Sequence, residues 1–108
     1  MSEEIIKLSC RELQKKIAKG EIKSSEAVSA VFTRIEKYDG QIGAFLSTFK
    51  QDALARAKEI DNKIAKGQKV GALAGVPIAV KDNMCTTFGT TTCASKILEN
   101  FHSPIMQP

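Results

Sequence analysis

The sequence of 108 residues has no tryptophan and one tyrosine, so it offers no row of aromatic side chains on which nucleic-acid bases could stack. It also has no long apolar run. The longest, Ala72 to Val80, is far too short to cross a bilayer and is interrupted by Gly75 and Pro77. The first four residues include two glutamates and no basic residue, where a secretion signal would be basic, so we expect a cytoplasmic protein without a membrane association. Cysteines are few and odd in number, which favours reduced thiols over a disulfide framework: Cys10, Cys85 and Cys93.

The positive charge is small and scattered. Lysine and arginine number 16 against 12 acidic residues, which gives a formal net charge of +4, and the two signs are interleaved along the chain. Such a pattern is typical of solvated helix surfaces, whereas binding to phosphate requires basic residues clustered on one face. We therefore do not expect this chain to bind RNA directly. With 43% hydrophobic and 26% charged residues, the composition is that of a globular protein of at most one domain.

The first helix is predicted from its start signal. Ser9 and Glu12 have the spacing of a capping box, and Leu8 can pack on Leu13 as a hydrophobic staple. Helical spacing of apolar residues continues until Gly20, which supplies a left-handed stop. The apolar positions are Cys10, Leu13 and Ile17.

Two further helices are predicted. Ser24 or Ser25 can cap the second helix, which ends near Gly40 and forms a hairpin with the first. Its apolar face comprises Val28, Val31, Phe32, Ile35 and Tyr38. The third helix runs from Gln51 to Lys66 and ends at Gly67.

Strands are predicted at two places, which makes the expected fold class α/β. The segment from Ala44 to Phe49 is short and rich in strand-forming residues. The run from Val76 to Val80 is apolar throughout, as in a buried strand, with Pro77 tolerable only near its start. Lys81 then stands at the carboxyl end of this strand, where ligands collect in open α/β sheets. Ser95 is expected to cap a short helix.

Lys81 has two interpretations on pattern alone. It is a surface lysine whose stem covers apolar neighbours, or it is a partly buried amine that stays neutral and serves as a base for a hydroxyl nucleophile. A kinase lysine is excluded because no Gly-x-Gly-x-x-Gly precedes it and Pro77 would break the central strand. No metal site is expected, since the spacing of Cys85, Cys93 and His102 fits no common zinc pattern.

Two motifs carry a resemblance to a known family. The run from Leu73 to Asn83 resembles the lysine motif of the amidase signature family, and Thr91 to Phe101 is similar to the run that sets amidotransferase A subunits apart from general amidases. The segments Ser24–Glu36 and Ala53–Ala65 also resemble the opening helices of that family. The likeness covers roughly residues 5 to 104.

The resemblance implies a fold and a catalytic role. Residues 1–104 would be the N-terminal part of an amidase domain, a helical hairpin followed by strands of a mixed sheet covered by helices, incomplete as it stands. In the family a Ser-cisSer-Lys triad cleaves the amide, and Lys81 matches its lysine. Both serines lie in a Gly/Ser-rich segment that this chain lacks. We therefore expect the chain to be inactive alone, and also poorly stable, because its central strand would be exposed on both faces and edges.

The resemblance also implies substrates and partners. In the tRNA-dependent amidotransferases of the family, a heterotrimer forms from A, B and C subunits. The A type hydrolyses glutamine, and the ammonia converts Glu-tRNA(Gln) or Asp-tRNA(Asn) to the amidated form. The B type would bind the tRNA and use ATP and magnesium, so no cofactor is expected in this chain. Two alternatives stay open: a fragment of a general amidase, and a non-catalytic binding module that docks in the complex.

The last four residues depart from the family pattern. After Ser103-Pro104 the family continues Tyr-Asn/Asp-Ala-Thr-Val, whereas this chain reads Ile105-Met106-Gln107-Pro108. Loss of one base from suitable codons reproduces the change. We therefore expect residues 105–108 to be an aberrant tail from a shifted reading frame.

Overall fold

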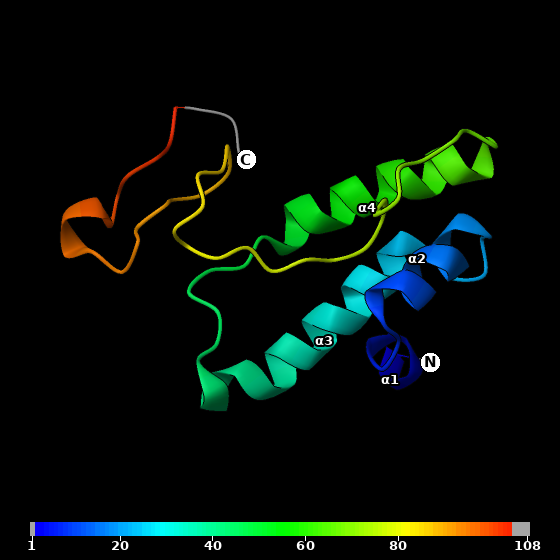
Figure 1. Cartoon of the computed structure of the whole chain (residues 1–108). Helices are drawn as coiled ribbons and strands as arrows, with labels where there is room; N and C mark the ends of the chain where they lie inside the picture. Colours follow the sequence, from blue (N-terminus) through cyan, green and yellow to red (C-terminus); the bar gives the residue numbers. More distant parts are fainter. Residues whose placement is uncertain (1, 105–108) are drawn as a thin grey trace. The chain divides into compact units, whose positions relative to one another are not determined.

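The computed structural model of the chain describes residues 2–104, which form two compact units that divide after Pro77 (Figure 1). All four α-helices of the described residues belong to the first unit, and the described part of the second contains one short 3-10 helix among loops. The helices are α1 (Ser2–Ile6), α2 (Cys10–Ala18), α3 (Ser24–Ile42) and α4 (Lys50–Ala65), and the 3-10 helix is η1 (Lys96–Leu98).

Helix α2 begins as predicted. The Ser9 N–H donates to a Glu12 carboxylate oxygen at 2.8 Å, and the Glu12 N–H donates to Ser9 Oγ at 3.2 Å, which completes the capping box. Gly20 follows the helix with φ +77°, so the predicted left-handed stop is also confirmed. The sequence patterns did not predict α1, a helix of 5 residues whose Ile5 is buried.

Helix α3 differs from the prediction at both ends. Its N-cap is Lys23, which offers no acceptor side chain, and Ser24 is already helical. The helix continues past Gly40 to Ile42 and ends at Gly43, whose φ is +67°. Gly40 is tolerated inside the helix because a single glycine costs only about 1 kcal/mol there.

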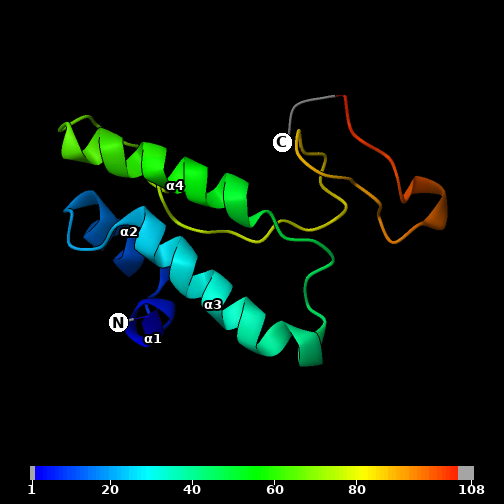
Figure 2. The same cartoon turned by 180° about the vertical axis from the view of Figure 1, so that it is seen from behind.

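The helical hairpin lies between α3 and α4 and not between the first two predicted helices. Figures 1 and 2 show α3 and α4 running in opposite directions, with α1 against α3 on its other side. Helix α4 confirms the predicted span, and Gly67 follows it with φ +73°. The buried cluster of the first unit joins α1, α2 and α3, and its members are Ile5, Leu13, Ile17, Ala27 and Ala30.

The predicted strands do not form within residues 2–104. Residues 44–49 and 76–80 are irregular, and residues 78–80 are exposed. A strand is stable only when neighbouring strands accept and donate its backbone hydrogen bonds, and the described part of the chain contains no such neighbour. The expectation of an α/β fold is therefore not met here, where the structure is helical.

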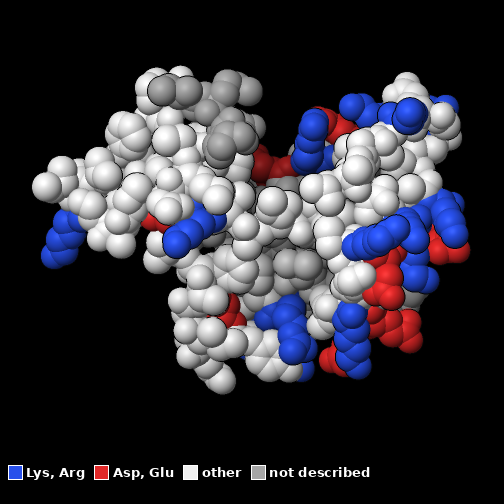
Figure 3. All heavy atoms as spheres, viewed as in Figure 1, with Lys and Arg blue, Asp and Glu red and all other residues white. Residues whose placement is uncertain are grey.

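Acidic and basic side chains are interleaved over the helices, as Figure 3 shows. The net positive charge comes from the first unit, because residues 78–108 carry two lysines and two acidic residues. Among residues 2–104, no helix is both long and apolar enough to cross a membrane. The expected aberrant tail, residues 105–108, lies outside the described residues.

Candidate functional site

Lys81 begins a turn in the second unit. Its carbonyl accepts a hydrogen bond from the Met84 N–H at 3.0 Å, which closes a four-residue turn from Lys81 to Met84. The side chain of Lys81 is exposed, and within the described residues its amine makes no ion pair or hydrogen bond. The amine is therefore free to meet another group.

Asp82, the next residue, is tied to a segment ten residues later. One carboxylate oxygen accepts from the Thr92 backbone N–H at 3.2 Å, and the other accepts from the Thr92 hydroxyl. The Asp82 carbonyl also accepts from the Cys93 N–H at 3.2 Å. Three hydrogen bonds thus join Asp82 to two consecutive residues.

The segment bound by Asp82 is a turn with an unusual backbone. Cys93 and Ala94 have φ +50° and +59°, and the Ser95 N–H donates to the Thr92 carbonyl at 2.8 Å. Two consecutive left-handed residues are typical of a type I′ turn, where glycine or asparagine is preferred. Each such residue costs on the order of 1–2 kcal/mol, so the surrounding hydrogen bonds must hold the turn.

Two buried threonines, Thr86 and Thr91, make further hydrogen bonds in this unit. The Thr91 hydroxyl donates to the Met84 carbonyl at 3.2 Å, and the Thr91 N–H donates to the Phe101 carbonyl at 3.0 Å. The Thr86 hydroxyl donates to the Phe88 carbonyl at 2.6 Å. The bonds that join the two runs that carried the resemblance, residues 73–83 and 91–101, are therefore those from Thr92 and Cys93 to Asp82, and Thr91 adds a bond to Met84, one residue past the first run.

The other candidate side chains of the second unit do not form a site. Cys85 and Cys93 are exposed and free, and His102 is exposed. Within residues 2–104 no group of three or more His, Cys, Asp or Glu side chains is placed to hold a metal ion. η1 follows Ser95, as predicted, although the Ser95 side chain makes no cap hydrogen bond.

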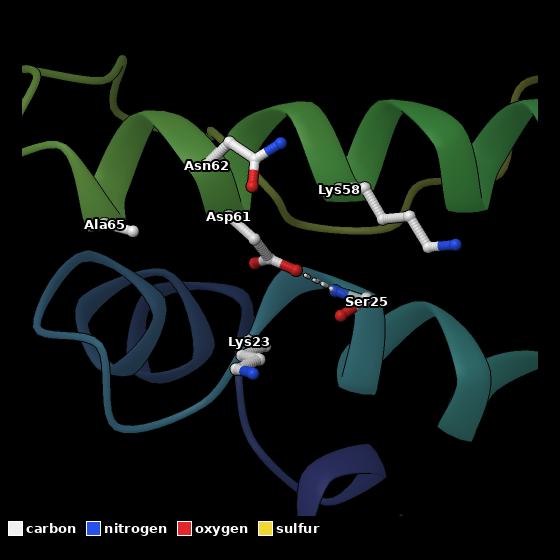
Figure 4. A pocket seen from close by; sticks show the side chains of 6 residues that line it. All are labelled: Lys23, Ser25, Lys58, Asp61, Asn62 and Ala65. Atoms are coloured by element: carbon white, nitrogen blue, oxygen red, sulfur yellow. Dashed lines mark hydrogen bonds between the residues drawn. The ribbon is translucent and has the colours of Figure 1, made fainter.

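A separate polar pocket lies in the first unit where α3 begins against α4. Its volume is about 270 Å³, and Figure 4 shows its lining. Asp61 of α4 occupies the helix end: its carboxylate accepts from the Ser24 N–H at 2.6 Å and from the Ser25 N–H at 3.1 Å. The amides that could bind an anionic ligand are therefore already paired. The lining residues are Lys23, Ser25, Lys58, Asp61, Asn62 and Ala65.

Sequence patterns alone do not reveal the contact of Asp82 with Thr92 or the cap that Asp61 provides for α3. Asp82 and Thr92 stand out in the sequence only as parts of motifs, and Asp61 does not stand out at all. A carboxylate and a threonine ten residues apart have no local signature. Only their place in two adjacent motifs could have suggested a contact.

The comparison with known families now identifies the class. The family model described as Amidase matches residues 26–105, which include both motifs and every residue of the Lys81 site named above. The chain therefore belongs to the amidase family.

Curated relatives agree with this class. The chain is 46% identical over 97 residues to the A subunit of the Glutamyl-tRNA(Gln) amidotransferase of Natranaerobius thermophilus, covering 90% of this chain and 20% of that protein. The protein of the same name from Chlamydia muridarum is 51% identical over 96 residues, covering 89% and 20%. That from Carboxydothermus hydrogenoformans is 46% identical over 101 residues, covering 94% and 21%. The chain spans about a fifth of the length of these relatives, and no solved structure matches it.

Proposed function

We propose that this chain supplies the general base of an amide-hydrolysing site, and that the base is the amine of Lys81. The supporting observation is that this exposed, unpaired lysine lies in a hydrogen-bonded loop built from the two motifs, inside the region that matches the amidase family. A lysine can give up its proton and act as a base, whereas an arginine cannot.

The reaction follows from the roles that the family resemblance implies. Lys81 would accept a proton relayed from a nucleophilic serine as the serine oxygen bonds to the amide carbonyl. It would return the proton to the nitrogen as the carbon–nitrogen bond breaks and ammonia leaves. Water then hydrolyses the ester between the serine and the acyl group, which releases the carboxylic acid and restores the serine hydroxyl. Neither serine of the family's Gly/Ser-rich segment is present, so the 108 residues alone should be inactive.

The relatives' names support glutamine as the nitrogen source. We propose that a complete protein containing this segment hydrolyses glutamine and delivers ammonia to its partners, the B and C subunits of an amidotransferase. The B type would amidate the aminoacyl-tRNA with ATP and magnesium, in the cytoplasm. A general amidase would instead hydrolyse simple amides as readily as glutamine, so their relative kcat/KM values distinguish the two functions.

Substitution of Lys81 tests the proposal. In a complete protein containing this segment, Lys81→Ala should lower kcat for glutamine hydrolysis by about 1,000-fold or more, because base and nucleophile act as a unit. Lys81→Arg should be nearly as damaging, since a guanidinium keeps its proton.

Two comparisons make the result specific. Lys96→Ala, a change at another exposed lysine of the same unit, should leave the rate unchanged. Amidation from added ammonia should survive Lys81→Ala, because that step belongs to the partner. A Lys81→Ala enzyme that hydrolyses glutamine within a few-fold of the unmutated one would refute the assignment.

A further inference from the structure

The Asp82 carboxylate is adjacent to a lysine and yet is bonded elsewhere. Both of its oxygens accept from Thr92, one from the backbone N–H and one from the hydroxyl. The side chains of Asp82 and Thr92 are both half-buried. Hydrogen bonds to an ionised acceptor are among the stronger ones, so this pair can organise a loop that has little regular structure.

This pairing fixes the backbone on both sides. On one side lies the Lys81–Met84 turn, closed by a hydrogen bond of 3.0 Å. On the other lies the left-handed turn at Cys93 and Ala94, which needs external support. Asp82 is the second residue of the first turn, and both its side chain and its carbonyl accept hydrogen bonds from the second, at Thr92 and Cys93.

Two consequences follow for Lys81. The direction in which its side chain leaves the backbone is set by a turn whose second residue is held in place. Its amine also makes no ion pair with the adjacent carboxylate, whose oxygens are bonded to Thr92, so the amine stays free to meet another group. A base needs both properties.

We propose that Asp82, held by Thr92, is the positioning residue of Lys81. The proposal rests on the proposed role of Lys81 as base. Asp82 and Thr92 themselves need not touch the substrate, so their loss should act on kcat through the lysine and leave KM nearly unchanged.

Kinetics of a complete enzyme containing these residues test the proposal. Asp82→Ala and Thr92→Val should each lower kcat for glutamine hydrolysis by about 10- to 100-fold, the cost of a misplacement near 1 Å. The double variant should be no worse than Asp82→Ala alone, because Asp82→Ala already removes both hydrogen bonds and Thr92→Val removes only the one from the hydroxyl. Thr92→Ser keeps the hydroxyl and should restore the rate to within about threefold of the unmutated enzyme. In the Lys81→Ala background, Asp82→Ala should cause no further loss.

Matched controls separate positioning from folding. Thr87→Val and Glu99→Gln make the same kinds of change at exposed residues of the same unit and should leave kcat unchanged. In the 108-residue chain, amide exchange at Thr92 and Cys93 should accelerate at least about tenfold in Asp82→Ala and Thr92→Val, and stay slow in Thr92→Ser.

The outcomes distinguish this inference from the proposed function. An inactive Lys81→Ala enzyme together with an Asp82→Ala enzyme within twofold of the unmutated kcat would overturn the positioning role alone. A further loss from Asp82→Ala in the Lys81→Ala background would show that Asp82 acts independently of the lysine, which also overturns it. An active Lys81→Ala enzyme would overturn the proposed function. If Asp82→Ala does not fold, Thr92→Val and Thr92→Ser still test the role: a loss of kcat in the first and its recovery in the second support it, and an unchanged kcat in Thr92→Val overturns it.

Discussion

Gly75 lies against Ser24, and among the glycines of the first unit it has the closest neighbours. Its φ is +84°, and a β-carbon added there would lie 3.0 Å from the Ser24 side chain and 3.1 Å from Ile17. The Ser24 hydroxyl, 1% exposed, donates to the Gly75 carbonyl at 2.8 Å. The segment that precedes Lys81 is therefore held against α3 by one hydrogen bond, at a position where only glycine allows so close an approach.

Gly75→Ala should destabilise the first unit by about 1–3 kcal/mol, because it combines a left-handed backbone with a clash. Gly40→Ala is the matched control: it lies within α3 with open space around it, and should stabilise by about 0.5–1 kcal/mol. Urea unfolding followed by circular dichroism measures both. Equal effects of the two substitutions would contradict the contact at Gly75.

At the scale of the helix, α3 depends on a cap from another helix. Lys23 provides no acceptor, although its N–H is bound by Glu26 at 3.0 Å. Asp61 of α4 instead accepts from the first two amides of the helix, those of Ser24 and Ser25, and Figure 4 shows the bond from Ser25. The cap therefore also joins the two arms of the α3–α4 hairpin.

Asp61→Ala should lower the free energy of unfolding by about 0.5–2 kcal/mol, the usual cost of a lost N-cap. The amides of Ser24 and Ser25 should exchange faster as a result. Asn62→Ala, at the exposed neighbouring position of α4, should have a small or stabilising effect. Unchanged exchange at Ser24 in Asp61→Ala would show that the cap contributes nothing.

The capping box of α2 predicts a dependence on pH. The Ser9 backbone N–H, and then its hydroxyl, hold the pKa of Glu12 below its ordinary value of 4.5. Because the folded state has the lower pKa, this contribution to stability is complete above the unfolded value and is lost as pH falls through the folded one. The Ser9 amide resonance should titrate with a midpoint below 4.5. Glu12→Gln keeps an acceptor that does not titrate, so in this variant the chemical shift of the Ser9 amide should not change over the same pH range.

At the scale of the whole chain, apolar side chains remain exposed in the second unit. Ile97 is 95% exposed, and five others are at least two-fifths exposed: Ile78, Val80, Met84, Phe88 and Phe101. Isolated exposed apolar residues are common, but six within about thirty residues favour association.

The isolated chain should therefore self-associate and bind a hydrophobic dye such as ANS. Ile78→Ser with Ile97→Ser should reduce both effects, since the pair includes the most exposed of these side chains. Lys63→Ser, at an exposed residue of α4, is the control and should leave self-association and dye binding unchanged. Sedimentation over a concentration series measures the association. A monomer with a sharp cooperative melt and no dye binding would contradict this prediction.

Local signals decided much of the chain by themselves. Ser9 with Glu12 predicts the start of α2, Gly20 and Gly67 predict helix ends, and apolar spacing predicts α4, because the interactions involved span at most one helical turn. The two motifs identified the family before any contact was known, and the match over residues 26–105 confirms it.

Tertiary structure decided what depends on residues far apart in sequence. The cap of α3 comes from Asp61, the α3–α4 hairpin replaces the predicted one, and the expected strand at residues 76–80 is absent from the described chain. A strand requires a neighbouring strand, and a helix cap such as that of α3 requires a side chain from another helix; local sequence specifies neither. The same holds for Lys81: the sequence determined that a lysine ends the apolar run, and only the fold placed Thr92 against Asp82 beside it. Tertiary packing determines which groups ten or more residues apart form hydrogen bonds, and local sequence patterns do not predict these pairs.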